Sequence, residues 1–576
     1  MNKVSIVCVI GLLLSVLTAV QAGLADTAAD LKQAEGLVKA GQYAQAEPIY
    51  RKVLQSDPNN AEAVHQSEKT LARIFVATDR LPQAQEAIEQ LLTRSAGHAR
   101  LPHALHEILD QAKTSGKTLQ VGQIYQSILE AQRDQPQAVW LKMGIAIANA
   151  HLGRDQAVES ALADIIDHHK ADDRSTEAFG QVAWAYRKLN QQDKARRVYQ
   201  YVVDTWPKQG RAALSQRGIV LCSLAMNDPN GADKATEELL RQFEKDKNLS
   251  EAVWGIARVH RDNSDWKRSR PLCEYILAHD PNSEQAVWAQ EALVWEAVAK
   301  NDPNGTEAGI RELLTRFSSR PNLPMALYGV ANLLSPRNPS KAQELYQYII
   351  DKHPANEFVP LSLAGIGIVK LVAGDEKAAQ GLYEKLRRDC SRFPRFSEAV
   401  ALIGQGYYQR ARTERALGRA EYAESYRKAI AVWEGITREM PESAITPQAC
   451  YHAAVVYGQE LGQYDKALDY YQRVAESWPD FEFAWHAQFF IGDCYQKLKK
   501  AGAIPADQAD AQMVEAYRAV IEKYPDCRSA PNAALRLGQL FYARAQWMEA
   551  AKSLEWFLQN ERKSVRPVAV HEFHSA

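Results

Sequence analysis

The chain has 576 residues, which is enough for roughly four domains of ordinary size. Hydrophobic residues make up 46% and charged residues 24%, a composition typical of a folded protein and unlike that of a disordered chain. The 69 Lys and Arg residues balance 70 Asp and Glu residues, which argues against a nucleic-acid partner, because backbone binders need an excess of clustered positive charge.

The first residues have the pattern of a targeting segment. One positive charge, Lys3, precedes an apolar run over residues 4–17, and small residues follow up to Ala22. We predict a signal peptide over 1–22, cleaved before Gly23, and a short linker over 23–29. The alternative is an uncleaved membrane anchor, although the run is shorter than the about 20 residues that a spanning helix needs. The expected location is therefore the periplasm or cell envelope, with membrane contact only through an uncleaved leader.

A pattern of small, aromatic and proline residues recurs along the rest of the chain. It is present in GQYAQAEPIYRKVLQSDPN (41–59), NQQDKARRVYQYVVDTWPK (190–208) and GQYDKALDYYQRVAESWPD (462–480). In the last copy the markers are Ala467, Tyr471, Val474 and Pro479. Residues at i, i+4 and i+7 share one helix face, and proline ends a helix, so each copy predicts a helix that stops at its proline.

A second apolar-periodic stretch precedes each of these helices, as in STEAFGQVAWAYRKLN (175–190) and APNAALRLGQLFYARA (530–545). Helix, turn and helix with these markers resemble the tetratricopeptide repeat. The resemblance implies an all-α, right-handed α-solenoid of about fourteen repeats over 30–563, followed by a tail over 564–576. The region 98–135 lacks most markers, and a division of the solenoid would fall there.

Two units are longer than the others. The insertion in 398–441 is rich in helix-favouring residues, so we expect it to extend both helices. The insertion in 484–525, KKAGAIPADQADAQ, is expected to form a looser surface loop.

The sequence NDPNG occurs at 227–231 and again at 301–305, and the similarity of the flanking residues indicates a duplicated pair of repeats. Asp can bond backbone amides, Pro sets φ, and Asn and Gly tolerate positive φ, so we predict a turn. One carboxylate is too few for a calcium loop, and no Lys-Ser or Lys-Thr completes a phosphate loop.

No motif indicates catalysis. The chain has neither H-E-x-x-H nor G-x-S-x-G, and the histidines of the HH pair at 168–169 and of HEFH at 571–574 are expected at the surface. We therefore predict no enzyme activity, cofactor or metal. Six cysteines follow the leader and are expected to be free and buried; if disulfides form, Cys494 with Cys527 is the first pair to test. The six are Cys222, Cys273, Cys390, Cys450, Cys494 and Cys527.

In tetratricopeptide-repeat proteins, positions 2, 5, 9, 12 and 13 of the first helix line the inner groove. Carried over to the units that start at Thr176 and Gln448 and to the last unit, the resemblance implies a partner groove with Glu177, Trp184, Arg187, Lys188, His452, Gln459, Glu460, Asn532, Gln539 and Tyr542. The partners implied are proteins or peptides. The stretch 524–558 also resembles repeats of bacterial envelope proteins, which suggests a scaffold in envelope assembly. The alternative is a carbohydrate-binding or enzyme-accessory protein that acts on envelope polysaccharide.

Overall fold

The computed structural model describes residues 27–38, 41–133, 135–209 and 211–561. The predicted signal peptide and the tail over 564–576 lie outside these residues. The contacts of the chain divide it into two compact units, whose main boundary lies between Arg337 and Asn338. The region 98–135 lies within the first unit.

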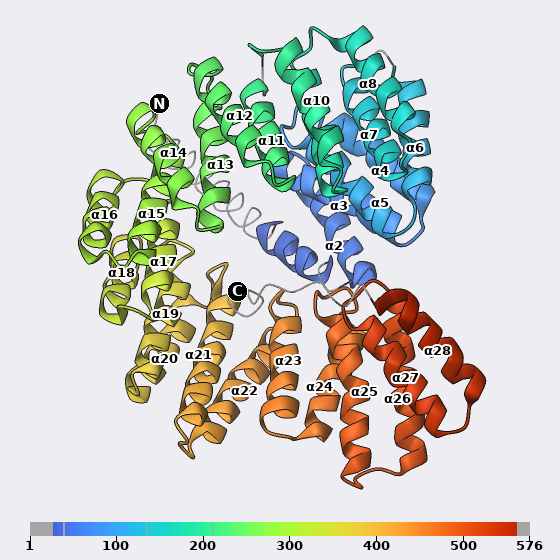
Figure 1. Cartoon of the computed structure of the whole chain (residues 1–576), viewed down its shortest axis with the longest axis vertical. Coiled ribbons are helices and arrows are strands. Elements are labelled where there is room, and N and C mark those ends of the chain that lie inside the picture. The colour runs from blue at the N-terminus through green and yellow to red at the C-terminus, as the bar shows by residue number, and fades with distance from the viewer. Residues whose placement is uncertain (1–26, 39–40, 134, 210, 562–576) are drawn as a thin grey trace, which may run out of the picture. The chain divides into compact units, whose positions relative to one another are not determined.

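The described residues form α-helices, one short π-helix and no strand, and within each unit successive helices lie side by side in chain order (Figure 1). Taken in order, the helix over 27–38 and α2 to α28 make fourteen consecutive pairs. We call the first helix of each pair, which has an odd number, the A helix, and the second the B helix. The predicted all-α solenoid of helix pairs is therefore confirmed.

The body of the first unit contains α2 (Tyr43–Ser56), α3 (Ala61–Ala77), α4 (Leu81–Arg94), α5 (Leu101–Thr114), α6 (Thr118–Ala131), α7 (Ala138–His151), α8 (Asp155–His169), α9 (Arg174–Lys188), α10 (Gln192–Thr205), α11 (Ala212–Ala225), α12 (Pro229–Gln242), α13 (Leu249–Asp262), α14 (Trp266–His279), α15 (Glu284–Ala299), α16 (Pro303–Arg316) and α17 (Leu323–Leu334). The second contains α18 (Pro339–Lys352), α19 (Val359–Val372), α20 (Glu376–Cys390), α21 (Phe396–Ala416), α22 (Tyr422–Glu439), α23 (Thr446–Val455), the π-helix η1 (Val456–Glu460), α24 (Tyr464–Ser477), α25 (Ala484–Lys500), α26 (Ala506–Lys523), α27 (Ala530–Ala543) and α28 (Trp547–Asn560).

The small and aromatic markers pack as the sequence predicts. Ala467, Tyr471 and Val474 are fully buried in α24. At other crossings a glycine faces an aromatic ring: a Cβ on Gly144 of α7 would lie 2.4 Å from the Tyr125 ring of α6. Such close approach leaves no room for a larger residue, so these positions set how tightly neighbouring helices pack.

Within the first unit the A helices pack directly on one another. Each A helix from α3 to α15 contacts the next A helix, and α5 also contacts α9, two repeats further along. The contact between α5 and α9 requires the row of helices to curve toward the A side. The A helices therefore form the inner wall of this unit.

The predictions for the two long units have different outcomes. In the first, α21 has 21 residues and α22 has 18, so the predicted extension of both helices is confirmed. In the second, the prediction of a looser loop is wrong, because α25 and α26 take up most of the insertion and leave only 501–505 between them. Gly502, with φ +69°, and Pro505 are the only helix breakers there, and Lys499 pairs with Asp510 at 2.6 Å across the turn.

Each NDPNG segment contains the predicted turn between two helices, but only its first Asn and its Asp lie in the turn, and its last three residues begin the next helix. Asn227 takes the left-handed conformation (φ +57°), Asp228 caps α12 by accepting a bond from the Gly231 amide at 2.9 Å, and Pro229 begins the helix. Gly231 is helical, and glycine fits there because a Cβ would lie 2.0 Å from Asp228 Oδ2. The copy at 301–305 has the same cap.

The cysteine prediction is also confirmed over the described residues, where all six cysteines are free and only Cys527 is not fully buried. Among the helices described, none has the length and hydropathy that crossing a membrane requires.

Candidate functional site

The inner wall of the first unit carries a cluster of tryptophan and arginine side chains. Trp254 and Arg261 lie on α13, and Trp295 lies on α15. The Arg261 guanidinium carbon is 5.4 Å from the centre of the Trp254 ring and 4.8 Å from that of Trp295. Both distances are within the range of cation–π attraction. The two indoles therefore hold the guanidinium in place, and the Arg261 side chain is only 12% exposed.

Glu291 lies beneath this cluster on α15. It is 6% exposed, and its Oε2 is 3.6 Å from Arg261 Nη1, which is longer than a hydrogen bond. Burial raises the pKa of Glu291 to about 7, although the Arg261 charge opposes the rise. Gly329 of α17 covers the carboxyl group, since a Cβ there would lie 2.5 Å from Glu291 Oε1. This carboxyl group is thus sealed between two A helices.

The surface continues onto the neighbouring A helices. Arg217 of α11 lies over Gly255 of α13 and pairs with Glu251 at 3.4 Å. On α17, Met325 is 51% exposed and Tyr328 is half-buried on the same face. Arginine, tryptophan, tyrosine and methionine are the residues enriched in the cores of protein interfaces. We call this surface, from α11 to α17, the Trp–Arg face.

The residues predicted on α9 belong to a second group on the same wall. Trp184 is 37% exposed, and its ring centroid is 4.3 Å from that of His106 on α5. Lys188 lies over the Trp184 ring at 4.6 Å and pairs with Asp110 of α5 at 2.5 Å. The structure thus brings these two predicted residues together with helix α5, two repeats earlier.

The other two predicted residues of α9 are less accessible. Glu177 pairs with Arg211 at 2.8 Å and is 16% exposed, and burial raises its pKa. Arg187 is half-buried, and its Nε has no hydrogen-bond partner among the described residues.

Buried histidines on this wall are a feature that the sequence did not reveal. His106 is fully buried, and neither ring nitrogen has a hydrogen-bond partner in the described part of the chain. Burial lowers the pKa of His106 to about 3 and that of the neighbouring His151 to about 4. Curvature of the A-helix wall encloses His106, and His151 beside it is half-buried. Of the histidines expected at the surface, His168 is exposed and His169 is half-buried, and 571–574 lie outside the described residues.

In the second unit the predicted residues of α23 and η1 serve mainly internal contacts. His452 packs against Trp433 with ring centroids 5.2 Å apart, and burial lowers its pKa to about 4. Glu460 accepts bonds from the Tyr426 hydroxyl at 2.9 Å and from Arg415 at 2.6 Å. Of the three predicted here, only Gln459 is exposed.

The predicted residues of α27 form one exposed stripe. Asn532, Gln539 and Tyr542 are all exposed, and Tyr542 contacts Trp547 of α28 with ring centroids 5.1 Å apart. They share a helix face, since their spacing is seven and three residues. The structure leaves them accessible but does not bring other predicted residues to them.

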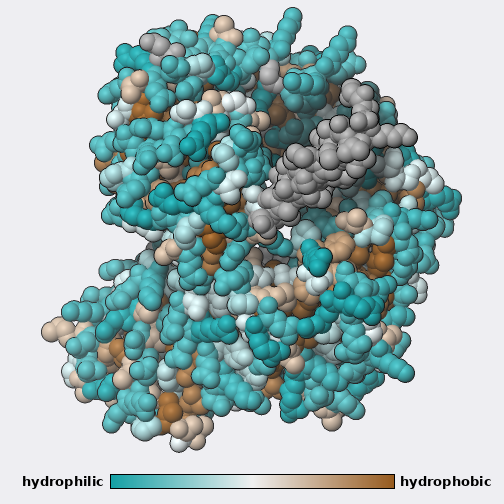
Figure 2. Space-filling view, turned by 180° about the vertical axis from the view of Figure 1, so that it is seen from behind, coloured by the Kyte–Doolittle hydropathy of each residue, from teal (hydrophilic) through white to brown (hydrophobic). Residues whose placement is uncertain are grey.

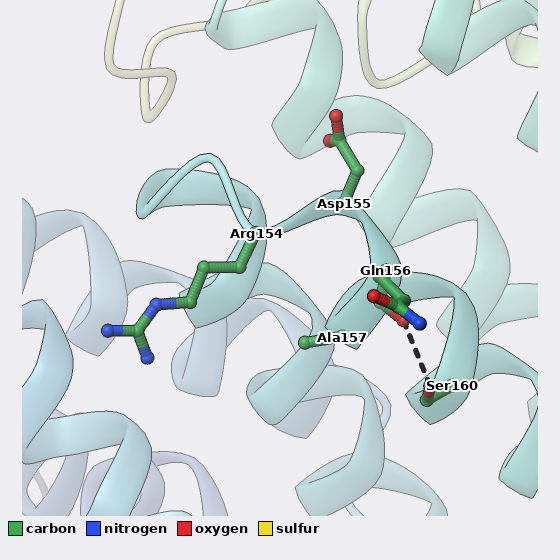
Figure 3. Close-up of a pocket in the computed structure, with 5 residues that line it drawn as sticks. All are labelled: Arg154, Asp155, Gln156, Ala157 and Ser160. Atoms are coloured by element: carbon green, nitrogen blue, oxygen red, sulfur yellow. Dashed lines mark hydrogen bonds between the residues drawn. The ribbon is translucent and has the colours of Figure 1, made fainter.

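A shallow depression at the start of α8 is lined by Arg154, Asp155, Gln156, Ala157 and Ser160, and its one internal bond runs from the Ser160 hydroxyl to the Gln156 carbonyl (Figure 3). The residues described include no cluster of His, Cys, Asp and Glu suited to a metal ion. On the face seen in Figure 2, hydrophobic patches are small and lie among hydrophilic residues.

Sequence profiles of one family match the chain. The tetratricopeptide repeat matches over residues 37–107 in one form and over 179–208 and 448–480 in another. The chain carries tetratricopeptide repeats in these segments. The matched segments include Trp184, Arg187 and Lys188 in the first unit and the residues predicted on α23 and η1 in the second. No curated protein sequence matches this chain.

Solved structures with a similar course include a Naa15/Naa10 complex bound to HypK-THB, at 12% identity over 92% of this chain and 88% of that one, with a TM-score of 0.35. Yeast Tom70 matches at 15% identity over 79% of this chain and 99% of its own, with a TM-score of 0.27. The APC/C hetero-tetramer Cut9-Hcn1 matches at 12% identity over 87% and 94%, with a TM-score of 0.23.

The tetratricopeptide offsets could have revealed the Trp–Arg face. Counted from Ser250, positions 2, 5, 9 and 12 are Glu251, Trp254, Arg258 and Arg261. Glu291 could not have been found in this way, because its burial depends on how α17 packs on α15.

Proposed function

We propose that this protein is a non-enzymatic scaffold that binds a protein or peptide partner on the Trp–Arg face of its first unit. Tetratricopeptide folds in general mediate contacts between proteins, which supports the proposal. The observation that carries it is the Trp254–Arg261–Trp295 cluster. Interface hot spots are rich in tryptophan and arginine held in rigid positions, because little side-chain entropy is then lost on binding.

The carbohydrate-binding alternative fits this cluster less well. Sugars stack on open aromatic faces, whereas the Arg261 guanidinium already covers a face of both Trp254 and Trp295. Arginine also offers several donors in a fixed plane, an arrangement suited to carboxylates and backbone carbonyls of a peptide.

We also propose that the protein works outside the cytoplasm, in the assembly of a bacterial cell envelope. The support is the sequence pattern of residues 1–22 and the likeness of 524–558 to repeats of envelope proteins. Cell fractionation with N-terminal sequencing tests the first part. A mature chain that begins at Gly23 supports export with cleavage, and a chain that begins at Met1 in the membrane fraction supports an anchor.

The binding function is tested by affinity capture from an extract of the native cells. Wild-type protein is compared with Trp254→Ala and with Leu119→Ala, a control on the B helix α6 whose side chain is 41% exposed. We expect specific partners to be lost from the first variant and retained by the second. Equal capture by all three proteins would contradict a partner site on the Trp–Arg face.

A further inference from the structure

The hydrogen-bonding capacity of Arg261 is only partly used within the Trp–Arg face, although two carboxylates lie near its charge. Its Nη2 pairs with Asp262 at 2.9 Å, a carboxylate whose side chain is 55% exposed to water. Its Nη1 faces Glu291 at 3.6 Å, beyond hydrogen-bond distance. A guanidinium fixed between two indoles, with one edge lacking a close acceptor, is suited to a further carboxylate.

We propose that this edge of Arg261 binds a side-chain carboxylate in an acidic segment of the partner, and that Glu291 takes up a proton as the segment binds. The proposal rests on the proposed function and names the chemistry of the partner. The incoming carboxylate accepts a hydrogen bond from Nη1, which Glu291 does not reach at 3.6 Å. The proton that neutralises Glu291 comes from solvent, so no buried carboxylate is left without a counter-charge.

A second arginine lies one turn away on the same helix. Arg258 is exposed, and no carboxylate pairs with it among the residues that the structure describes. The spacing of three residues places Arg258 and Arg261 on one face of α13, so two acidic residues of a partner could be bound together.

The position of the cluster favours an internal segment over a chain terminus. Half-exposed apolar residues continue on both sides of it, with Leu221 on α11 and Met325 and Tyr328 on α17. A bound chain can therefore cross the arginines and bury apolar side chains before and after them. A terminal carboxylate would use only one of these sides.

The groups around Glu291 explain why it takes up a proton when the segment binds. The charged groups that act on it are Arg261 and Asp262 of α13, and Trp295 of its own helix also contacts it. Helix α17, which covers it, has no charged residue. Its pKa is already raised to about 7 by burial, and a second carboxylate nearby would raise it further by repulsion. If only the neutral form permits binding, affinity should be about tenfold higher at about pH 6 than at about pH 8.

The test begins with the full protein and a random-peptide display library. Enriched peptides are made as C-terminal amides, with each Glu or Asp replaced in turn by Gln or Asn, and their dissociation constants are measured at two pH values. We expect enriched peptides to contain paired acidic residues and to lose about tenfold or more in affinity when one is neutralised. Comparison with the free-acid peptide separates a side-chain from a terminal carboxylate.

Variants of the protein show which side chains bind the carboxylate and cause the pH dependence of the affinity. Arg261→Lys keeps the charge but not the planar fork, and we expect about tenfold weaker binding. Glu291→Gln should bind as well at high pH as at low pH. Arg241→Gln, on the B helix α12, changes the net charge equally and should leave the affinity within about twofold. Circular dichroism confirms that each variant is folded.

The outcomes separate the two proposals. If enriched peptides need Trp254 but not acidic residues, the scaffold function stands and the carboxylate proposal is overturned. If affinity follows pH equally in wild type and Glu291→Gln, the role of Glu291 is overturned. If no peptide depends on the Trp–Arg face, both proposals fail.

Discussion

Acid should weaken the first unit through His106, whose ring lies fully buried between α5 and α9. Because the folded protein keeps this ring neutral, the ring binds a proton more readily in the unfolded chain. Proton binding at low pH therefore lowers the free energy of unfolding. The pKa falls from 6.5 to about 3 on folding, chiefly through burial; Asp110 at 3.8 Å opposes the fall, while Lys188, His151 and His103 add to it. The contribution of the neutral ring to the free energy of unfolding is complete above pH 6.5, the pKa of histidine in the unfolded chain. It is lost as the pH falls toward about 3, the pKa in the folded protein.

The size of the effect follows from linkage. At 1.36 kcal/mol per pKa unit, His106 should cost about 2 kcal/mol of unfolding free energy between pH 7 and pH 5, and about 3 kcal/mol between pH 7 and pH 4. The side chain is only 1% exposed, so solvent screening reduces these values little. His106→Gln has a similar size and does not titrate, and should lack this part of the pH dependence.

The assay is urea unfolding of wild type and His106→Gln, followed by circular dichroism from neutral to acid pH. Other histidines and paired carboxylates also titrate, but they act equally in both proteins, so only the difference between the curves is used. We expect His106→Gln to have a lower free energy of unfolding than wild type at pH 7. The difference between the two proteins should shrink as the pH falls. Parallel loss of stability in the two proteins would refute the role assigned to burial.

Three further predictions concern packing and capping. Asp228→Ala should lower the free energy of unfolding by about 1 kcal/mol, because it removes a helix cap. Gly231→Ala should destabilise the wild-type protein more than it destabilises the Asp228→Ala variant, because its Cβ clashes with the Asp228 carboxylate. An equal loss in the two backgrounds, measured by thermal melts, would contradict this. Gly144→Ala should destabilise by about 1–3 kcal/mol, whereas Gly180→Ala, which meets open space, should stabilise by up to about 1 kcal/mol, as thermal melts can show. Glu460→Ala should speed amide hydrogen exchange in 456–460, since this carboxylate anchors the π-helix; unchanged protection there would disprove its role.

Much of the fold is predictable because tetratricopeptide markers act locally. Ala467, Tyr471 and Val474 mark the buried face of one helix by spacing alone, and proline marks its end. The turn at NDPNG was predicted in the same way, from the preferences of five adjacent residues. The loop expected over 499–512 is confined to 501–505, since few helix breakers are present and the flanking residues favour helix.

The sequence by itself determined the helix pairs, their order and the residues that face their partners, because each depends on contacts within one or two repeats. Only the tertiary structure decided what the inner wall contains. Lys188 meets Asp110 across 78 residues, Glu291 is sealed by a glycine of the next A helix, and His106 is enclosed by α9. These contacts depend on the rotation from each repeat to the next, which accumulates along the solenoid and is specified by no single repeat.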